Sequence, residues 1–213
     1  MIKLSTGIPI VRWLLGSLLL VHSVSFAQAV DGQHLLKQRL SQLKTFQANF
    51  SQRVTDAHKT LLQEAEGNIV LQYPNQLYWR LHEPNDNVLV ADGLTLWQLD
   101  PFMEQVVAVD QKAAIDNNPL ILLTNPDDKA WLEYNISEKN NQFIITPKSQ
   151  QGEIAKLVLS FDGANLVAMQ IIDGQQQVSD LVFAAIQQNH KVDQALFKFV
   201  VPEGYELDDQ RVP

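Results

Sequence analysis

The stretch Ala48-Asn49-Phe50-Ser51-Gln52-Arg53-Val54 decides the fold class of this chain. Apolar Ala48, Phe50 and Val54 alternate with polar neighbours. In an extended backbone, successive side chains point to opposite faces, so this period predicts a β-strand with one apolar and one polar face. The same two-residue period returns in most of the sequence that follows.

An amphipathic helix precedes this strand. Leu36, Leu40 and Leu43 recur at spacings of four and three residues, and Leu35 can extend the same apolar stripe. Asp31 is suited to cap the first turn, because its side chain can accept a hydrogen bond from a free backbone N–H. The spacing predicts a helix of about four turns with one buried face.

Further alternating runs follow the first strand and are separated by turn sequences. Asp92-Gly93 and Asp162-Gly163 are typical of two-residue hairpins, while Asp100-Pro101, Asn140-Asn141 and Asp173-Gly174 indicate other turns. Many sequential strands joined by short turns form one antiparallel sheet that is strongly curved or closed. The predicted strands are Leu61–Leu71, Leu77–Leu81, Asn87–Ala91, Leu94–Leu99, Glu104–Val109, Tyr134–Ser137, Phe143–Thr146, Ile154–Phe161, Leu166–Asp173, Val178–Ile186 and Phe197–Val201.

One segment between the predicted strands breaks this pattern. Asn118 can cap a short helix, Pro119 suits its first turn and Pro126 ends it. The residues between the two prolines are almost wholly apolar, so another part of the protein must cover them. The segment is either a plug packed permanently on the sheet or a lid over a cavity, and the plug is the simpler interpretation.

The first 27 residues are typical of a secretory signal peptide. Two basic residues precede a short apolar run, 13–21, and small residues lead to Ala27. The run is shorter than the roughly 20 apolar residues of a membrane-spanning helix. We expect cleavage after Ala27, with Ala29 as the alternative, which leaves residues 28–213 as one exported domain.

The composition excludes several classes of function. With 16 Lys+Arg against 24 Asp+Glu, the net charge of −8 would repel the phosphates of nucleic acids. The absence of cysteine excludes disulfides, thiolate metal ligands, a Cys nucleophile and a lipid-modified Cys. The histidines lack metal-ligand spacing, and the chain has no hydrolase, dinucleotide-binding or P-loop motif. We therefore expect no cofactor, no metal and no enzyme activity.

What the sequence has in excess is apolar side chains. The additional run Leu120–Leu123 suggests apolar surface beyond what a curved sheet and one helix need for a core. Acyl chains would use such surface, since burial of a CH₂ group contributes about 0.8 kcal/mol.

Six strings in order along the chain carry a family resemblance. They are Phe50-Ser51-Gln52-Arg53-Val54, Gly67-Asn68-Ile69, Tyr73-Pro74-Asn75-Gln76-Leu77-Tyr78-Trp79, Val90-Ala91-Asp92-Gly93-Leu94-Thr95-Leu96-Trp97, Asp100-Pro101-Phe102-Met103-Glu104-Gln105 and Pro202-Glu203-Gly204-Tyr205-Glu206-Leu207-Asp208-Asp209-Gln210. Together they resemble the LolA family of periplasmic outer-membrane lipoprotein carrier proteins. The resemblance runs from the first predicted helix to Arg211.

The resemblance implies a fold and an activity. The fold is mainly β with helices: an incomplete, strongly curved antiparallel β-barrel, or half-barrel, whose concave apolar face is covered by short α-helices that act as a lid. The activity is that of a monomeric carrier in the periplasm of a Gram-negative bacterium. It accepts acylated lipoproteins released from the inner membrane by an ABC transporter, shields their acyl chains in an apolar cavity and delivers them to an outer-membrane receptor.

The resemblance also implies roles for single residues. Family members usually carry an arginine where this chain has Tyr73, and that arginine holds the lid closed, so Tyr73 and Arg80 are the candidate latch residues here. Leu77 is the candidate for docking partners. The cavity positions are Phe50, Val54, Ile69, Leu71, Trp79, Leu89 and Trp97, and the lid positions are Pro119, Leu120, Leu122 and Leu123.

Other interpretations stay open beside the carrier. A periplasmic lipid-binding sensor would use the same half-barrel. The outer-membrane receptor of the same pathway is anchored through an acylated cysteine, which this chain does not have. A lipid-cleaving enzyme would need an activated nucleophile, for which the sequence offers no motif.

Overall fold

The computed structural model describes residues 32–84, 86–114, 123–125, 128–149, 152 and 154–211. Its helices are α1 (Gly32–Ser41), α2 (Gln111–Ala114), α3 (Asp128–Trp131) and a 3₁₀ turn, η2 (Gln194–Phe197). Its strands are β1 (Thr45–Thr55), β2 (Leu61–Gln72), β3 (Gln76–Leu81), β4 (Val88–Ala91), β5 (Thr95–Asp100), β6 (Gln105–Asp110), β7 (Tyr134–Lys139), β8 (Gln142–Pro147), β9 (Ile154–Asp162), β10 (Asn165–Asp173), β11 (Val178–Gln188) and β12 (Glu206–Asp209).

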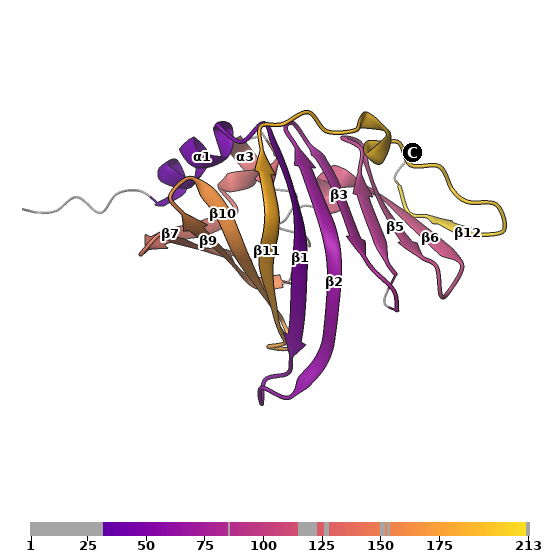
Figure 1. The fold of residues 1–213 in the computed structure, drawn as a ribbon, viewed down its shortest axis with the longest axis horizontal. Coiled ribbons are helices and arrows are strands. Elements are labelled where there is room, and N and C mark those ends of the chain that lie inside the picture. Colours follow the sequence, from indigo (N-terminus) through magenta and orange to yellow (C-terminus); the bar gives the residue numbers. More distant parts are fainter. Residues whose placement is uncertain are drawn as a thin grey trace, which may run out of the picture.

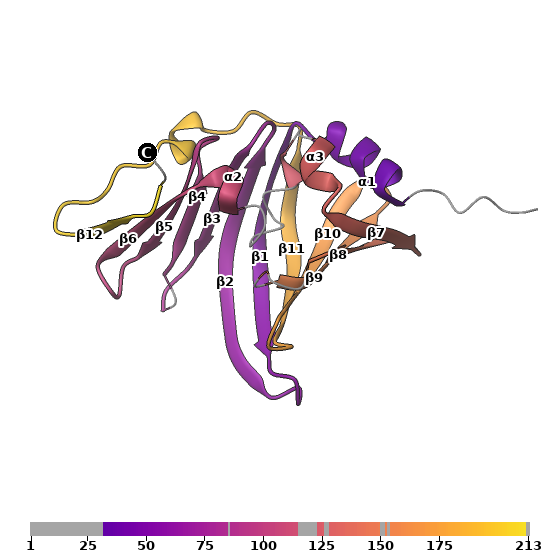
Figure 2. The same ribbon diagram turned by 180° about the vertical axis from the view of Figure 1, so that it is seen from behind.

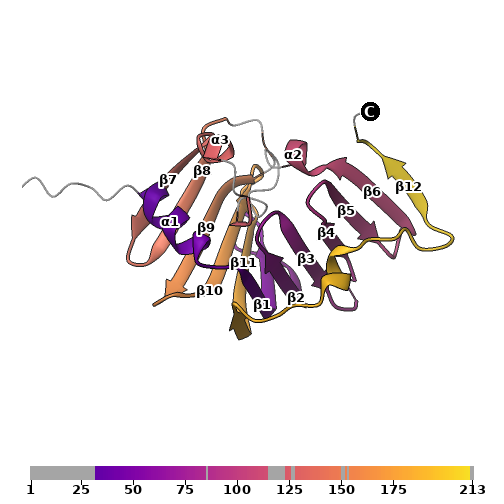
Figure 3. The same cartoon turned by 90° about the horizontal axis from the view of Figure 1, so that it is seen from above.

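All strands of the described residues belong to one open sheet. Their order is β12-β6-β5-β4-β3-β2-β1-β11-β10-β9-β8-β7, with every neighbouring pair antiparallel except β12 and β6, which run parallel. The sheet curves strongly around β1 and β2, and its two arms do not meet (Figures 1 and 3). The expectation of a mainly β, curved antiparallel sheet is confirmed, and the sheet is open rather than closed.

The alternation of side chains along β1 creates the inner, concave face of the sheet. Phe46, Ala48 and Phe50 are at most 3% exposed, whereas the residues between them face solvent. Ala48 lies opposite Ile69 of β2, and Ile69 lies opposite Trp79 of β3, so the same face stays apolar from strand to strand. These residues belong to one core cluster that extends across both arms of the sheet.

The three α-helices of the described residues lie on the concave side. Figure 2 shows α2 and α3 in front of the sheet, and Figure 3 shows them at the opening between its arms. Helix α1 packs against β7, where a Cβ on Gly32 would come within 2.9 Å of the Ile136 carbonyl oxygen, so only glycine fits. The predicted first helix is confirmed but ends earlier than expected, because Leu43 follows its last residue. Within the described residues, no helix has the length and apolar character needed to cross a membrane.

The end of the chain differs from the expectation. The prediction of a strand at Phe197–Val201 is wrong. Phe197 is instead the last residue of η2, and Asp193 caps this turn by accepting a hydrogen bond from the Ala195 N–H at 2.9 Å. Phe197 is buried in a small cluster on the convex face with Val70. The chain then runs along the outside of β3 and β4 to β12, which the sequence analysis did not predict (Figure 3).

Candidate functional site

The concave face brings together six of the seven expected cavity positions. Trp79 is 9% exposed, and Phe50, Ile69 and Leu71 are more deeply buried in the same cluster. Leu89 lies opposite Trp79 and is half-buried against that cluster. Val54 follows on the same face of β1, half-buried, between Gln63 of β2 and Ser179 of β11. The inner face is therefore an apolar surface that spans β1 to β4 around Phe50, whereas Gln52 separates Phe50 from Val54 along β1.

An aromatic contact across β2 forms the centre of this surface. The rings of Phe50 and Trp79 lie 4.3 Å apart between centroids, at an interplanar angle of 38°. Gly67, on β2 between them, makes the contact feasible, since a Cβ there would lie 2.4 Å from the Phe50 Cζ and 2.2 Å from the Arg80 carbonyl oxygen. Nothing in the local sequence around Gly67 shows that a neighbouring ring needs the space that a side chain would fill.

Leu77 does not lie at an accessible rim. Its side chain is 0% exposed, and it lies between Leu71 of β2 and Ala91 of β4 on the concave face. The prediction that Leu77 docks partners is wrong for this structure, because a fully buried side chain presents no surface. The physical reason is its alternation with Trp79 two residues later, which places both on the apolar face.

Trp97 lies on the opposite, convex face, so its prediction as a cavity residue is wrong. Leu96 takes the concave position instead and is 8% exposed in the core cluster. Trp97 stacks on Phe199, with ring centroids 5.1 Å apart. The turn at Asp92 sets this register, because its carboxylate accepts the backbone N–H of Leu94 and of Thr95, each at 2.8 Å.

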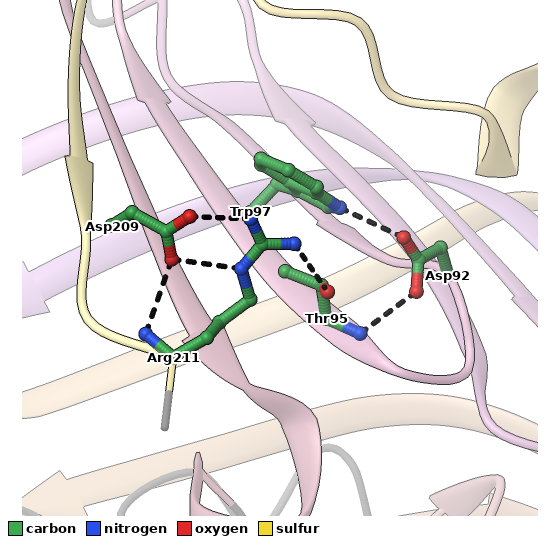
Figure 4. Close-up of polar contacts among 5 residues, drawn as sticks. All are labelled: Asp92, Thr95, Trp97, Asp209 and Arg211. Atoms are coloured by element: carbon green, nitrogen blue, oxygen red, sulfur yellow. Dashed lines mark hydrogen bonds and ion pairs between the residues drawn. The ribbon is translucent and has the colours of Figure 1, made fainter. Parts of the chain in front are cut away.

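Trp97 belongs to a polar cluster that fastens the end of the chain to β5 (Figure 4). We name Asp92, Thr95, Trp97, Asp209 and Arg211 the C-terminal clasp. The Trp97 Nε1–H donates to the Asp92 Oδ2 at 2.8 Å, and the Arg211 guanidinium lies 5.1 Å from the Trp97 ring. The same guanidinium donates to Asp209 Oδ1 at 2.8 Å and to the Thr95 Oγ1 at 3.4 Å. The C-terminal clasp brings together residues from two of the six sequence strings on which the family resemblance rests.

The two candidate latch residues have different surroundings. Arg80 lies on the convex face between two inward-facing residues and donates to the Asp86 carboxylate at 3.1 Å, which raises its pKa. This placement removes Arg80 from the concave face, so its prediction as a latch is wrong. Tyr73 is 37% exposed at the turn after β2, with the Lys44 ammonium 5.0 Å from its ring. Its role as a latch stays a prediction.

Most of the predicted lid, including Pro119, Leu120 and Leu122, lies outside the described residues. Leu123 is 4% exposed and packs in the same core cluster as Phe50. Thr124, beside it, accepts the Asn75 backbone N–H through its carbonyl at 2.9 Å. The described end of this segment is therefore held by the turn between β2 and β3.

A buried amide that the sequence analysis missed supports this turn. Gln111, 3% exposed at the start of α2, donates from Nε2 to the Asn75 carbonyl at 2.8 Å. Its Oε1 accepts the Gly93 backbone N–H at 2.9 Å. Gln111 thus joins the β2–β3 turn to the β4–β5 turn, and no sequence pattern marks a single glutamine for such a role.

Comparisons with known proteins agree with this architecture. Residues 41–200 match the family model described as "Outer membrane lipoprotein carrier protein LolA". The chain belongs to the LolA family. A curated relative from Shewanella halifaxensis, named outer-membrane lipoprotein carrier protein, is 38% identical over 191 residues, 90% of each chain. A relative of the same name from Pectobacterium carotovorum is 36% identical over 94% of this chain and 98% of its own.

Solved structures support the LolA fold alone. A LolA superfamily protein from Nitrosomonas europaea superposes with a TM-score of 0.50 at 13% identity, over 80% of this chain and 99% of that one. A putative outer membrane lipoprotein-sorting protein domain from Vibrio parahaemolyticus also gives 0.50, at 9% identity over 79% and 97% of the two chains. At this identity the likeness concerns the open curved sheet and no single residue.

The buried amide yields a first prediction. We expect Gln111→Ala to lower the free energy of unfolding by about 1–3 kcal/mol, because the Gly93 N–H and the Asn75 carbonyl lose their partner. Urea unfolding measures the change, and hydrogen exchange should speed up at the amide of Gly93, which donates to the Gln111 side chain. Wild-type exchange at the Gly93 amide in the variant would contradict the bridging role of Gln111.

The clasp yields a second prediction, on pH. The hydrogen bond from the Arg211 side chain, followed by that from its backbone, lowers the pKa of Asp209 from 3.8 to about 2. A carboxyl with a lowered folded-state pKa stabilises the fold above its unfolded pKa and loses this effect as the pH falls towards the folded value. We expect the docking of β12 to weaken between pH 4 and pH 2.

The fluorescence of the tryptophans follows this transition, since Trp97 lies beside Arg211. Asp209→Asn is the matched control, because it keeps the shape of the side chain and removes its titration. The variant should show no transition of this origin. An identical acid transition in both proteins would show that another group is responsible.

Proposed function

We propose that this protein is a periplasmic carrier of acylated lipoproteins. In this proposal it accepts a lipoprotein released from the inner membrane by an ABC transporter, shields the acyl chains and passes them to an outer-membrane receptor, with no bond made or broken. The observation that carries the proposal is the continuous apolar concave face around Phe50, Ile69 and Trp79, in a chain of the LolA family. Its curated relatives bear the name of that activity.

The packing of Leu123 suggests how loading and release both proceed with only a small change in free energy. Leu123 packs in the apolar cluster of the concave face, and entering acyl chains would take over its contacts at about 0.8 kcal/mol per buried CH₂. Covered and filled states then differ little in free energy, so a ligand or a partner surface can shift the population. We propose on this basis that the helices at the opening, with Pro119, Leu120, Leu122 and Leu123, act as a lid rather than a plug.

The route of the chain is part of the same proposal. Residues 1–27, outside the described residues, would direct export and be removed, leaving 28–213 as a monomeric domain in the periplasm of a Gram-negative cell. The whole chain carries a net charge of −8, and removal of two basic residues makes the exported form more acidic. Transporter and receptor surfaces that meet it are therefore expected to be basic.

Release from spheroplasts tests the proposal. Purified protein is added to spheroplasts that retain newly made outer-membrane lipoproteins, and the supernatant is assayed for a soluble one-to-one complex. We expect release of the acylated client and none of an unacylated version. If nothing is released from membranes that contain its own transporter, the carrier proposal fails and the sensor hypothesis replaces it.

Neighbouring residues of β4 provide matched variants for this assay. Leu89 and Val88 are both half-buried, but Leu89 faces the concave surface and Val88 lies opposite Arg80 on the convex one. We expect Leu89→Glu to reduce release about tenfold or more, because a carboxylate would be desolvated by acyl chains. Val88→Glu should release client like the wild type.

A further inference from the structure

The hairpin tip between β5 and β6 presents apolar side chains that the fold does not use. Phe102 is 93% exposed and Met103 is 63% exposed. This hairpin lies at the end of the sheet next to β12 (Figure 1), where Leu207 is a further 42% exposed. Neither residue at the tip belongs to a described core cluster, so their apolar character has no explanation in folding.

The tip is held in one shape. The Asp100 carboxylate accepts the backbone N–H of Phe102 at 2.9 Å and that of Met103 at 3.0 Å. On the other side, the Glu104 carbonyl accepts the backbone N–H of Glu206, which ties the tip to β12. A backbone fixed in this way loses little entropy when the two side chains become buried against a partner.

Acidic groups surround these apolar side chains. Asp100 and Glu104 flank them in sequence, and Glu206 and Asp208 lie on the adjacent β12. No lysine or arginine occurs between Asp100 and Asp110, or between Lys198 and Arg211. This charge opposes contact with an anionic lipid surface and favours a surface that combines an apolar pocket with basic residues.

We infer that Phe102 and Met103 form a docking tip for a protein of the cell envelope that presents an apolar socket ringed by lysine or arginine side chains. The placement in the envelope rests on the proposed function, whereas the chemistry of the socket rests on the tip alone. The tip lies at the other end of β5 from the C-terminal clasp, so docking there leaves the clasp intact.

Binding to membrane vesicles tests this inference without any transport step. Fluorescently labelled wild-type protein, a Phe102→Ser/Met103→Ser variant and a Leu94→Ser control are titrated onto inner- and outer-membrane vesicles of the source bacterium. Leu94 is an apolar residue in the turn before β5 with 81% exposure, so it matches the tip in exposure but not in place. Because the exchanged side chains are exposed, all three proteins should have the same melting temperature.

We expect saturable binding by the wild type and by Leu94→Ser, and about tenfold or greater loss of affinity in the tip variant. Protease treatment of the vesicles should abolish binding, and raising salt from about 0.05 M to about 0.5 M should weaken it. Equal binding by all three proteins, no binding by any, or tip-dependent binding to protein-free lipid vesicles would overturn the inference. The spheroplast assay with acylated client remains a separate test of the carrier proposal.

Discussion

Replacement of Gly67 by valine is expected to lower the free energy of unfolding by about 3 kcal/mol or more. Even the first added carbon would overlap the Phe50 ring at 2.4 Å and the Arg80 carbonyl oxygen at 2.2 Å. The ring cannot turn away without losing its contact with Trp79, and the carbonyl belongs to the backbone of the paired strand. The strain must therefore open the β2–β3 pairing or displace the centre of the concave face.

Thermal unfolding monitored by circular dichroism measures this effect. For a domain of this size, about 3 kcal/mol corresponds to a decrease of roughly 6–12 °C in the melting temperature. Gly163→Asn is the control: a Cβ there has nothing within 4 Å, and asparagine tolerates the left-handed backbone at φ 56°. A Gly67→Val protein that melts with the wild type would show that β2 and β3 can separate without cost.

Trp97→Ala is expected to release the end of the chain from the sheet. The substitution removes the stack on Phe199, the cation–π contact of Arg211 and the hydrogen bond to Asp92. We expect a loss of about 2–3 kcal/mol, below the cost for a fully buried tryptophan because Trp97 is half-buried. Without its anchor, β12 should leave β6, whose backbone then becomes an unpaired strand edge.

Hydrogen exchange resolves where this loss occurs. Amides of β6 that face β12 should exchange at least about tenfold faster in Trp97→Ala, whereas those of β1 and β2 should keep most of their protection. Trp97→Phe keeps a ring for the stack and loses only the indole N–H, so it should retain most of the protection. If β6 stays fully protected in Trp97→Ala, the clasp does not hold β12.

How well the sequence predicts which side chains face the core depends on the difference in polarity between neighbouring residues. Phe50 stands between polar Asn49 and Ser51, so alternation alone assigned it to the buried face. Leu96 and Trp97 are both apolar, and a period of two cannot decide which faces inward. The structure decides it through the Asp92 turn, whose hydrogen bonds set the register of β5.

Other parts of the structure had no local signal. β12 contains Glu206, Asp208 and Asp209 and lacks an alternating pattern; it becomes a strand because it finds the free edge of β6 in a parallel register. Gln111 and Gly67 act through residues far away in the sequence. Such roles depend on neighbours in the tertiary structure and can be recognised only when the arrangement of the strands is known.

The pairing of β1 with β11 affects the order in which the strands of the sheet can form. Phe50 lies opposite Phe183, so the central seam of the sheet joins an early strand to one of the last. Contacts of such long sequence separation form slowly. While the chain is being synthesised, β1 must wait for most of the protein to appear before its second neighbour exists. That delay keeps the central seam of the sheet open until β11 has been synthesised, so the two arms of the sheet join late in folding.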